Sequence, residues 1–235
     1  KTNFMLCEIE QSTSTDLKFY LIHEHGILIR DCQNFMGISN HFFRVATQRP
    51  EENDVSIDAI RQYVERQLGA FASPMRSRDA FFGSAAFTDL IHLLQLEETH
   101  ADISFNAPLT FNTDIKAGPI YMSDMFKLYR FENKIYVLRM TGEEVRKHLE
   151  RSYDLWVNTM KSPDDHIMML NEGSAGDEQR RGFKNLTFNF DSAAGIDYVV
   201  DVTKPDGQKV HILQFSDGRP FDEKAWYKVV MNSYR

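Results

Sequence analysis

Residues 186–233 hold four short runs of strand-forming residues that are separated by turn residues. The runs are LTFNFD (186–191), YVVDVTK (198–204), KVHILQF (209–215) and YKVVMNS (227–233). Alternating segments rich in Val, Ile, Phe and Tyr are typical of β-strands, and the sequence Pro205-Asp206-Gly207 between two of them is typical of a turn. We therefore expect this part of the chain to supply strands to a sheet.

The sequence of the first part of the chain predicts a compact αβ unit that covers residues 1–68. Ser12 to Thr15 offer N-cap side chains for a helix, and Gly26 is suited to the left-handed backbone that ends one. Pro50 is favoured in the first turn of a second helix, which we expect to continue to about Leu68. The predicted elements are a strand at 2–9, a helix at 15–25, strands at 26–32 and 42–48, and a helix at 50–68.

The stretch GAFASPMR (69–76) combines Gly, Ser and Pro, which predicts a domain boundary. A second, larger unit is therefore expected at 69–235. In this unit Thr141, Glu143 and Glu144 form a capping signal for a helix that ends near Asn158. Residues 161–182 have no apolar period and predict an exposed loop. The other predicted elements are helices at 80–98 and 123–129 and strands at 101–105 and 134–140. The fold class is therefore α+β, a small αβ domain followed by a mixed-sheet α/β domain.

Charge and hydropathy exclude several partners. The net charge of −7 argues against a nucleic-acid-binding protein, which needs a basic face. No apolar run approaches the roughly 20 residues of a membrane span, and the segment KTNFMLCEIEQ lacks the pattern of a signal peptide. Cys7 and Cys32 allow one disulfide, but both lie in strand-like runs, where free thiols are more common.

Known catalytic patterns are missing from the sequence. Metal-activated hydrolysis of phosphate uses clusters such as Asp-x-His or Gly-Asn-His, and none occurs. His23 and His25 point in different directions on a helix, which favours solvated side chains over a shared metal. Neither a Gly-x-Ser-x-Gly motif nor a phosphate-binding glycine loop is present. We therefore expect no catalytic residue, no metal and no cofactor in this chain.

Two aromatic residues on connections are suited to holding a base. Phe131 precedes the predicted strand at 134–140, and Tyr234 follows the last predicted strand. Binding residues concentrate on such connections, and a base stacks on an aromatic plane with a gain of about 1–3 kcal/mol. The alternative is that both rings are ordinary core or rim aromatics.

Three segments in order carry a family resemblance. RDAFFGSAAFTDLI (78–91), the stretch 101–145 and YKVVMNSYR (227–235) resemble the C-terminal domain of the bacterial 5'-nucleotidase family, from about residue 70 onward. The middle stretch contains G-x-I-x-x-x-D, then F-x-N, then a strand that ends in M-T-G. The resemblance implies a nucleotide-recognition domain whose divalent metal pair would sit in a catalytic domain that this chain lacks.

The resemblance also implies roles for individual residues. Two aromatic rings would stack on the base, amides would orient it, and arginines would meet the phosphate. The residues are Phe131 and Tyr234 for stacking, Asn133 and Asn106 for the amides, and Arg78 with nearby Arg76 for the anion. The chain departs from the family where Asn-Gly-Gly-Gly-Ile-Arg is replaced by NAPLTF (106–111), and it stops before the glycine-rich segment that follows the second aromatic ring.

The first unit resembles a different family. GILIRDCQNF (26–35) and FFRVATQRPEEND (42–54) are similar to the C-terminal small domain of pyridoxal-phosphate enzymes such as threonine-phosphate decarboxylase and histidinol-phosphate aminotransferase. The resemblance implies that Arg44 grips a substrate carboxylate, a task suited to the guanidinium fork. The Schiff-base lysine motif is not in the sequence, so Arg44 paired with an acidic neighbour is the alternative.

Three functions therefore remain open from the sequence. The first is a nucleotide- or nucleoside-recognition domain of a 5'-nucleotidase-type phosphohydrolase. The second is a fragment of a pyridoxal-phosphate enzyme, with that cofactor as its ligand. The third is a non-catalytic fusion of two folded parts. The nucleotidase resemblance implies an exported, periplasmic protein and the pyridoxal one a cytoplasmic protein, and neither base preference nor oligomeric state follows from the sequence.

Overall fold

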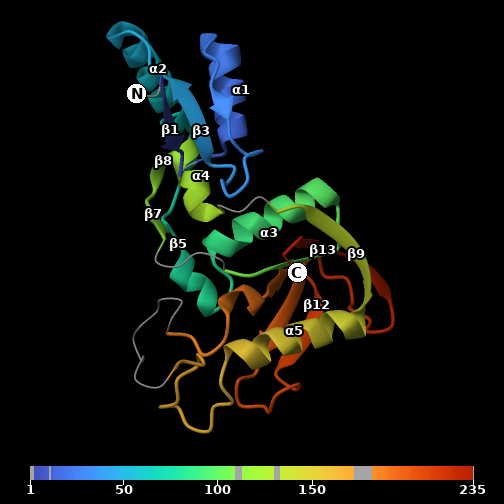
Figure 1. The fold of residues 1–235 in the computed structure, drawn as a ribbon. Coiled ribbons are helices and arrows are strands. Elements are labelled where there is room, and N and C mark those ends of the chain that lie inside the picture. The colour runs from blue at the N-terminus through green and yellow to red at the C-terminus, as the bar shows by residue number, and fades with distance from the viewer. Residues whose placement is uncertain (1–2, 11, 109–112, 130–132, 172–181, 235) are drawn as a thin grey trace. The chain divides into compact units, whose positions relative to one another are not determined.

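The computed structural model describes residues 3–10, 12–108, 113–129, 133–171 and 182–234, without the side chain of Phe126. Helices and strands are mixed along the chain, as the α+β prediction requires (Figure 1). The chain divides into two compact units. Unit 1 contains residues 1–74 and 115–131, and unit 2 contains residues 75–114 and 132–235.

Unit 1 is built on a three-stranded antiparallel sheet with the order β1-β3-β2. The strands are β1 (Phe4–Glu8), β2 (Arg30–Asp31) and β3 (Phe42–Ala46), and the helices are α1 (Ser14–His25) and α2 (Pro50–Val64). Its core contains Leu17 and Leu21 of α1, Phe43 of β3, and Ala59 and Tyr63 of α2. This small core joins one face of each helix to the sheet.

Helix α1 begins and ends where the sequence predicts. The Thr13 side chain accepts a hydrogen bond from the backbone N–H of Asp16, and Gly26 ends the helix with a φ of 66°. These local bonds satisfy backbone groups that a helix terminus leaves without intrahelical partners. Both Cys7 and Cys32 are free thiols, in agreement with the sequence.

The prediction that α2 continues to Leu68 is wrong. The helix ends at Val64, and the following residues form β4 (Gln67–Phe71), which pairs with β8 (Gly118–Tyr121). The partner strand lies far along the chain, so tertiary pairing overrides local helix propensity here. Helix α4 (Met122–Leu128) follows β8 directly, and Met122 packs against the core of unit 1.

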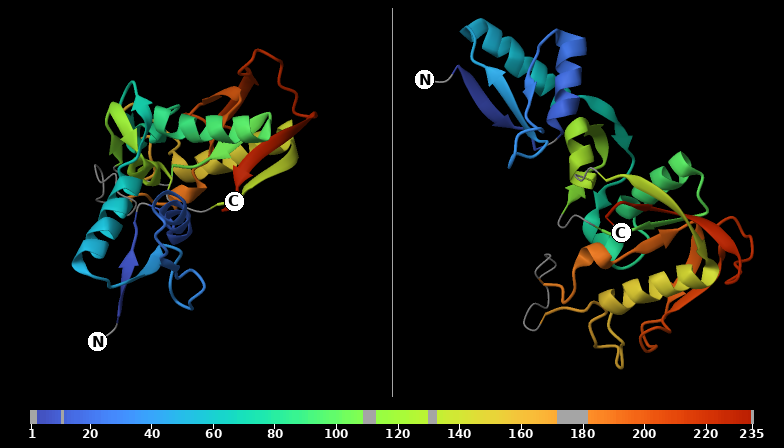
Figure 2. Two further views of the ribbon diagram at one scale, coloured as in Figure 1. Left: turned by 90° about the horizontal axis from the view of Figure 1, so that it is seen from above. Right: turned by 45° about the vertical axis from the view of Figure 1, so that its right-hand side comes forward.

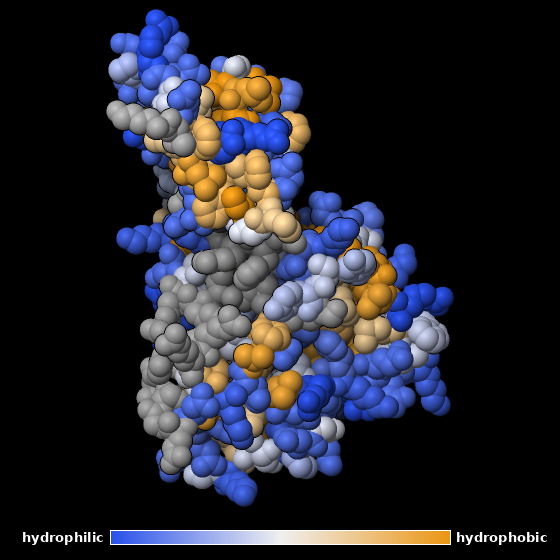
Figure 3. Space-filling view, in the orientation of Figure 1, coloured by the Kyte–Doolittle hydropathy of each residue, from blue (hydrophilic) through white to orange (hydrophobic). Residues whose placement is uncertain are grey.

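Part of the surface of unit 1 is apolar (Figure 3). On β1, Phe4 is 37% exposed and Met5 and Leu6 are each 50% exposed. The face of unit 2 in the same view is mainly hydrophilic with scattered apolar groups. Strand β1 lies at the edge of its sheet, where part of its surface is left to solvent.

Unit 2 is built on a four-stranded sheet with the order β10-β6-β13-β9. The strands are β6 (Ile103–Asn106), β9 (Ile135–Thr141), β10 (Ser192–Ala194) and β13 (Trp226–Asn232). Strands β6 and β13 are parallel, and the other two pairs are antiparallel. A hairpin of β11 (Ile196–Val200) and β12 (Val210–Phe215) follows β10. The short strands β5 (Met75–Arg76) and β7 (Asp114–Ile115) form a further pair.

Two helices lie on opposite sides of this sheet (Figures 1 and 2). Helix α5 (Gly142–Trp156) buries Val145 and Leu149 in one core with Ile103 and Phe105 of β6. Helix α3 (Ala86–Thr99) covers the other face, where its side chains reach Ser104. The strand alternation of β6 therefore separates an apolar face toward α5 from a more polar face toward α3.

The capping signal at Thr141 is confirmed. The Thr141 hydroxyl accepts a hydrogen bond from the Glu144 N–H at 3.2 Å, and the Glu144 carboxylate accepts one from the Thr141 N–H at 2.7 Å. This reciprocal pair is a capping box and fixes the first turn of α5.

Two other sequence predictions in unit 2 are wrong. The helix expected at 80–98 is split into a 3₁₀ turn, η1 (Ser77–Phe81), and α3, with Gly83 at a φ of 149° between them. The strand expected at 186–191 is instead a second 3₁₀ turn, η2 (Thr187–Asn189), followed by β10. The Ser152 hydroxyl on α5 lies within hydrogen-bond distance of the carbonyl groups of Asn189 and Asp191, so this backbone is satisfied without a neighbouring strand.

Candidate functional site

One end of the sheet in unit 2 collects three of the predicted site residues. Because β6 and β13 are parallel, their C-terminal ends lie at the same edge, and the antiparallel β9 begins there. Asn106 is the last residue of β6, Tyr234 comes just after β13, and Asn133 comes just before β9. We call this edge the sheet-end site, defined by Asn106, Asn133 and Tyr234.

Hydrogen bonds tie the connection before β9 to the one after β13. The Ser233 N–H donates to the Lys134 carbonyl at 2.7 Å, and the Lys134 N–H donates to the Ser233 Oγ at 3.1 Å. The Ser233 hydroxyl in turn donates to Asn133 Oδ1 at 3.4 Å. Asn133 and Tyr234, which are far apart in sequence, are therefore held next to each other.

The ring of Tyr234 is accessible and supported from one edge. Its side chain is 58% exposed, and it meets the ring of Phe188 edge-on with centroids 5.4 Å apart and an interplanar angle of 90°. The Tyr234 N–H also donates to Asn232 Oδ1 at 3.0 Å, which fixes the backbone. The second predicted ring, Phe131, lies outside the described residues, so the pairing of the two rings stays a prediction.

Asn106 is completely buried. Its backbone carbonyl accepts a hydrogen bond from the Ser192 hydroxyl at 3.2 Å, but its amide oxygen and nitrogen have no hydrogen-bond partner among the described residues. A buried amide without a partner costs about 1–3 kcal/mol. Asn106 is therefore a polar group held at the sheet end with its hydrogen-bonding capacity unused by the described part of the chain.

The two predicted arginines lie on other elements of unit 2. Arg76 ends β5, and its Nε is 3.9 Å from the Asp114 carboxylate, a surface ion pair that contributes little to stability. Arg78 is an exposed residue of η1 and lines a cavity of about 380 Å³ together with Asp164, Asp165 and His166. The structure thus groups the two asparagines with Tyr234 and places the arginines outside the four-stranded sheet.

Arg44 in unit 1 is half-buried on β3. Its guanidinium carbon lies 3.9 Å from the centroid of the Phe4 ring, which is a cation–π contact. Its Nε is buried and has no hydrogen-bond partner among the described residues. An aromatic ring therefore takes the place of the acidic neighbour that the sequence offers as an alternative.

Neither a metal centre nor a membrane span is found in the described part of the chain. No group of three or more His, Cys, Asp or Glu side chains gathers there in a way that could hold a metal ion. No helix among the same residues is long and apolar enough to cross a membrane.

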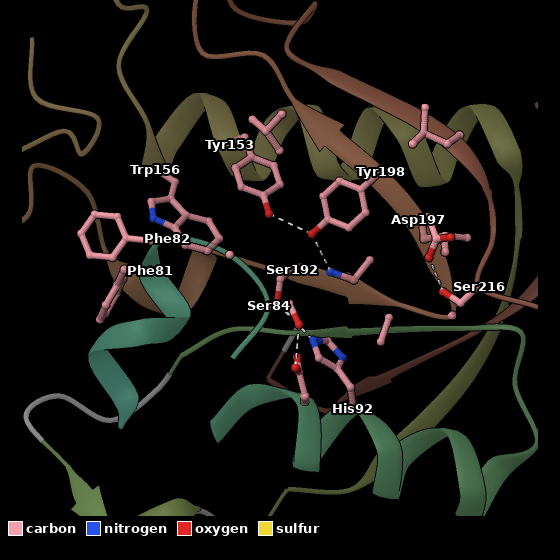
Figure 4. A pocket seen from close by; sticks show the side chains of 18 of the residues that line it. Phe81, Phe82, Ser84, His92, Tyr153, Trp156, Ser192, Asp197, Tyr198 and Ser216 are labelled. Atoms are coloured by element: carbon pink, nitrogen blue, oxygen red, sulfur yellow. Dashed lines mark hydrogen bonds between the residues drawn. The ribbon is translucent and has the colours of Figure 1, made fainter. Parts of the chain in front are cut away.

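Sequence reasoning missed a large cavity in unit 2, with a volume of about 1020 Å³ (Figure 4). Segments from η1, α3, α5, β10, β11 and β12 contribute to its wall. No motif with fixed spacing marks it, because the wall comes from segments that are distant in sequence. The only local signal is His92, a lone histidine on the buried side of a predicted helix.

A chain of hydrogen bonds fixes His92 at the wall of this cavity. Ser104 Oγ lies 2.8 Å from His92 Nδ1 and donates its own proton to Gln95 Oε1 at 2.6 Å. Ser104 must therefore accept from His92, which places the histidine proton on Nδ1. His92 Nε2 then carries no proton and faces the Ser192 hydroxyl at 3.1 Å, whose single proton is shared between Nε2 and the Asn106 carbonyl.

Burial lowers the pKa of His92 from 6.5 to about 4. The charged imidazolium loses its hydration in the interior, and the nearby Asp89 and Asp191 offset only part of this loss. The side chain is therefore neutral at pH 7, in keeping with a single ring proton on Nδ1.

We expect unit 2 to lose stability as the pH falls from 7 to 5. The unfolded histidine takes up a proton near pH 6.5, whereas the folded one stays neutral until about pH 4, so acid favours the unfolded state. The loss from this residue is about 2 kcal/mol between pH 7 and 5. Urea unfolding followed by tryptophan fluorescence measures it, because both tryptophans lie in unit 2. The control is His92→Gln, which does not titrate and should flatten the pH dependence; an equal slope in both proteins contradicts the assignment.

A short segment of the chain matches pyridoxal-phosphate enzymes. A protein of Caldanaerobacter subterraneus that is assigned as a threonine-phosphate decarboxylase is 42% identical over 65 residues, which are 28% of this chain and 17% of that protein. A histidinol-phosphate aminotransferase of Archaeoglobus fulgidus matches over 39 residues. These matches confirm the second resemblance over a small part of the chain.

The larger part of the chain matches nucleotidases. The model of the family "5'-nucleotidase, C-terminal domain" matches residues 54–235. The 2',3'-cyclic-nucleotide 2'-phosphodiesterase/3'-nucleotidase of Salmonella typhimurium is 28% identical in an alignment of length 212 that covers 76% of this chain and 31% of that protein. A Staphylococcus aureus structure assigned as a 5'-nucleotidase, solved with α-ketoglutarate, has the same fold with a TM-score of 0.60, 21% identity and coverage of 80% of this chain and 35% of its own. The chain thus spans about a third of these proteins, and it belongs to the 5'-nucleotidase C-terminal domain family.

Proposed function

We propose that unit 2 recognises the base of a nucleotide or nucleoside at the sheet-end site, for a phosphohydrolase whose metal-bearing domain lies outside this sequence. The observation that carries the proposal is the juxtaposition of Asn133 with the exposed ring of Tyr234 by hydrogen bonds through Ser233. An aromatic plane beside an amide supplies both stacking and an edge contact for a flat heterocycle.

Stacking supplies most of the affinity in this proposal. Tyr234 offers a ring that is 58% exposed and is fixed by its backbone bond to Asn232 and by Phe188. Phe131 lies outside the described residues and stays the sequence-based candidate for a second stacking ring. Two such planes hold any base, with about 1–3 kcal/mol from each stacked ring.

Amides and arginines supply selectivity in this proposal. Asn133 has an amide that can donate to and accept from the edge of a base, and Asn106 is proposed to orient the same ligand. Arg76 and Arg78 are proposed to meet the phosphate, for which a guanidinium fork is suited. Hydrolysis itself needs water activated by a divalent metal pair, which we assign to the separate domain.

We expect AMP and adenosine to bind to the full chain, and Tyr234→Ala to weaken binding of both by about 5- to 150-fold, the equivalent of one lost stacking contact. Isothermal titration calorimetry measures the affinities. Tyr234→Phe keeps the ring and should bind within about threefold of wild type.

The control for this titration is Phe19→Ala, which removes an exposed ring on α1 of unit 1. It should leave the affinity for AMP unchanged. No heat of binding at millimolar AMP, or equal binding by wild type and Tyr234→Ala, contradicts the proposal.

Pyridoxal phosphate is a second candidate ligand, carried only by the short match and by Arg44. The Nε–H of Arg44 on β3 has no hydrogen-bond partner among the described residues. A carboxylate or phosphate oxygen is a suitable acceptor for it. Without a Schiff-base lysine the cofactor is not expected to form a covalent adduct at this site. Calorimetric titration of the chain with pyridoxal phosphate tests this: binding that Arg44→Met abolishes supports the candidate, and no heat of binding at millimolar cofactor opposes it.

A further inference from the structure

The cavity of about 1020 Å³ in unit 2 shares no residue with the sheet-end site, because none of the three residues that define that site lines it. Aromatic side chains form much of its wall. Tyr153 and Trp156 come from α5, Tyr198 comes from β11, and His92 reaches the cavity from α3 (Figure 4). Small-molecule sites in proteins typically enclose about 300–1,000 Å³ with walls of this kind.

The charged groups that line the cavity are all acidic. The Asp89 carboxylate accepts a hydrogen bond from the Ser84 hydroxyl at 2.6 Å, and the Asp197 carboxylate accepts one from the Ser216 hydroxyl at 2.7 Å. Among the described residues that line the cavity there is no lysine and no arginine. His92 is neutral at pH 7 because of its burial. The cavity therefore repels anions, including nucleotide phosphates, and attracts cations.

Trp156 provides a second and independent indication of a ligand. Its ring is stacked between Tyr153, with centroids 4.9 Å apart, and Phe190, with centroids 5.4 Å apart, and the side chain is 1% exposed. Its indole N–H has no hydrogen-bond partner among the described residues. Buried donors nearly always have a partner, so a donor left unused at a cavity wall favours a ligand with an acceptor atom.

An irregularity in the pairing of the hairpin strands lies in this cavity wall. The pairing of β11 and β12 shifts at Asp197 and Tyr198, so that Leu213 is an extra residue on β12. All three residues line the cavity, and Leu213 is 55% exposed. Bulges of this type redirect side chains and are over-represented beside binding sites.

We propose that this cavity binds a ring-bearing organic amine in its cationic form. The aromatic wall attracts a cation through its π-faces, Asp89 and Asp197 neutralise the charge, and the Trp156 N–H donates to an acceptor on the ring. A nucleotide is excluded by its charge, so this site and the sheet-end site take different ligands.

A matched series of three ligands tests the proposal on the full chain. The ligands are 5-methoxytryptamine, which is cationic, 5-methoxytryptophol, which is neutral, and 5-methoxyindole-3-acetate, which is anionic. All three share one ring and one ether acceptor, so differences in affinity report the effect of charge. We expect calorimetry to show the amine binding at least tenfold more tightly than the alcohol, and the acetate not binding.

Variants assign the binding to this cavity. Asp197→Asn and the double variant with Asp89→Asn keep the shape of the carboxylates and the hydroxyl contacts but remove the charge. They should reduce the preference for the amine over the alcohol at least fivefold and leave the affinity for the alcohol unchanged. Tyr234→Ala should bind the amine like wild type, which separates this site from the nucleotide proposal.

Two results overturn the proposal. The first is that none of the three ligands binds wild-type protein at millimolar concentration. The second is that the alcohol or the acetate binds as tightly as the amine. Both are measured on the unmodified chain, so neither depends on whether a variant folds.

Discussion

Replacing Gly195 with alanine is expected to destabilise unit 2 by about 3–5 kcal/mol, from backbone strain and overpacking together. Gly195 joins β10 to β11 with a φ of 92°, a conformation that L-residues rarely adopt. An added Cβ would also collide with the backbone carbonyl of Asp102. Asp102 cannot move away easily, because its N–H and its carboxylate both bond to the backbone of Lys228.

Gly218→Ala is the matched control for this prediction. Gly218 has a similar φ of 88°, but nothing lies near its would-be Cβ. Its replacement should therefore cost only the strain of the left-handed backbone, about 1–2 kcal/mol. Urea unfolding by tryptophan fluorescence compares the two proteins. Equal losses for the two variants contradict the close packing of Gly195 against Asp102.

Glu150→Ala is expected to destabilise unit 2 by about 2–5 kcal/mol, because it leaves two buried donors unpaired. Glu150 is 4% exposed, and its two carboxylate oxygens accept the backbone N–H groups of Lys209 and Val210 at 2.9 and 2.8 Å. These bonds join α5 to the first residue of β12 and to the residue before it. Loss of the carboxylate therefore removes these two bonds between the helix and the hairpin.

Glu150→Gln is the control for that variant, measured in the same unfolding experiment. Its amide oxygen still accepts one of the two N–H groups, so we expect it to lose about half as much stability as Glu150→Ala. If the alanine variant unfolds within 0.5 kcal/mol of wild type, a range typical of surface substitutions, Glu150 does not hold the hairpin.

Local chemistry made some elements predictable from the sequence. Thr13 and Gly26 bound α1, and Thr141 with Glu144 begins α5, through hydrogen bonds between residues within a few positions of each other. Such bonds depend only on neighbouring residues, so the sequence shows them directly.

Long-range contacts decided the elements that the sequence did not predict. Helix α2 stops before Leu68 because the next residues pair with β8, about fifty positions later. The strand expected at 186–191 gives way to η2, where Ser152 of α5 contacts the backbone and Phe190 stacks on Trp156. Neither partner can be identified from local sequence patterns.

Of the two candidate sites, the sequence indicated one and not the other. Asn133 and Tyr234 were named through a family resemblance, and the adjacent ends of β9 and β13 explain why they lie together. The large cavity was not predicted, because its polar groups, such as Asp89 and Asp197, come from a helix and a hairpin that no spacing connects. Only the folded chain places these carboxylates on one aromatic cavity.

The most direct test of nucleotide recognition maps the binding site of AMP by NMR. We expect AMP to shift the backbone amide signals of Asn133, Lys134, Ser233 and Tyr234 in the isotope-labelled full chain, and these shifts to vanish in Tyr234→Ala. Signals unchanged at millimolar AMP, or shifts confined to cavity residues such as Gly195 and Ser216, would contradict the account.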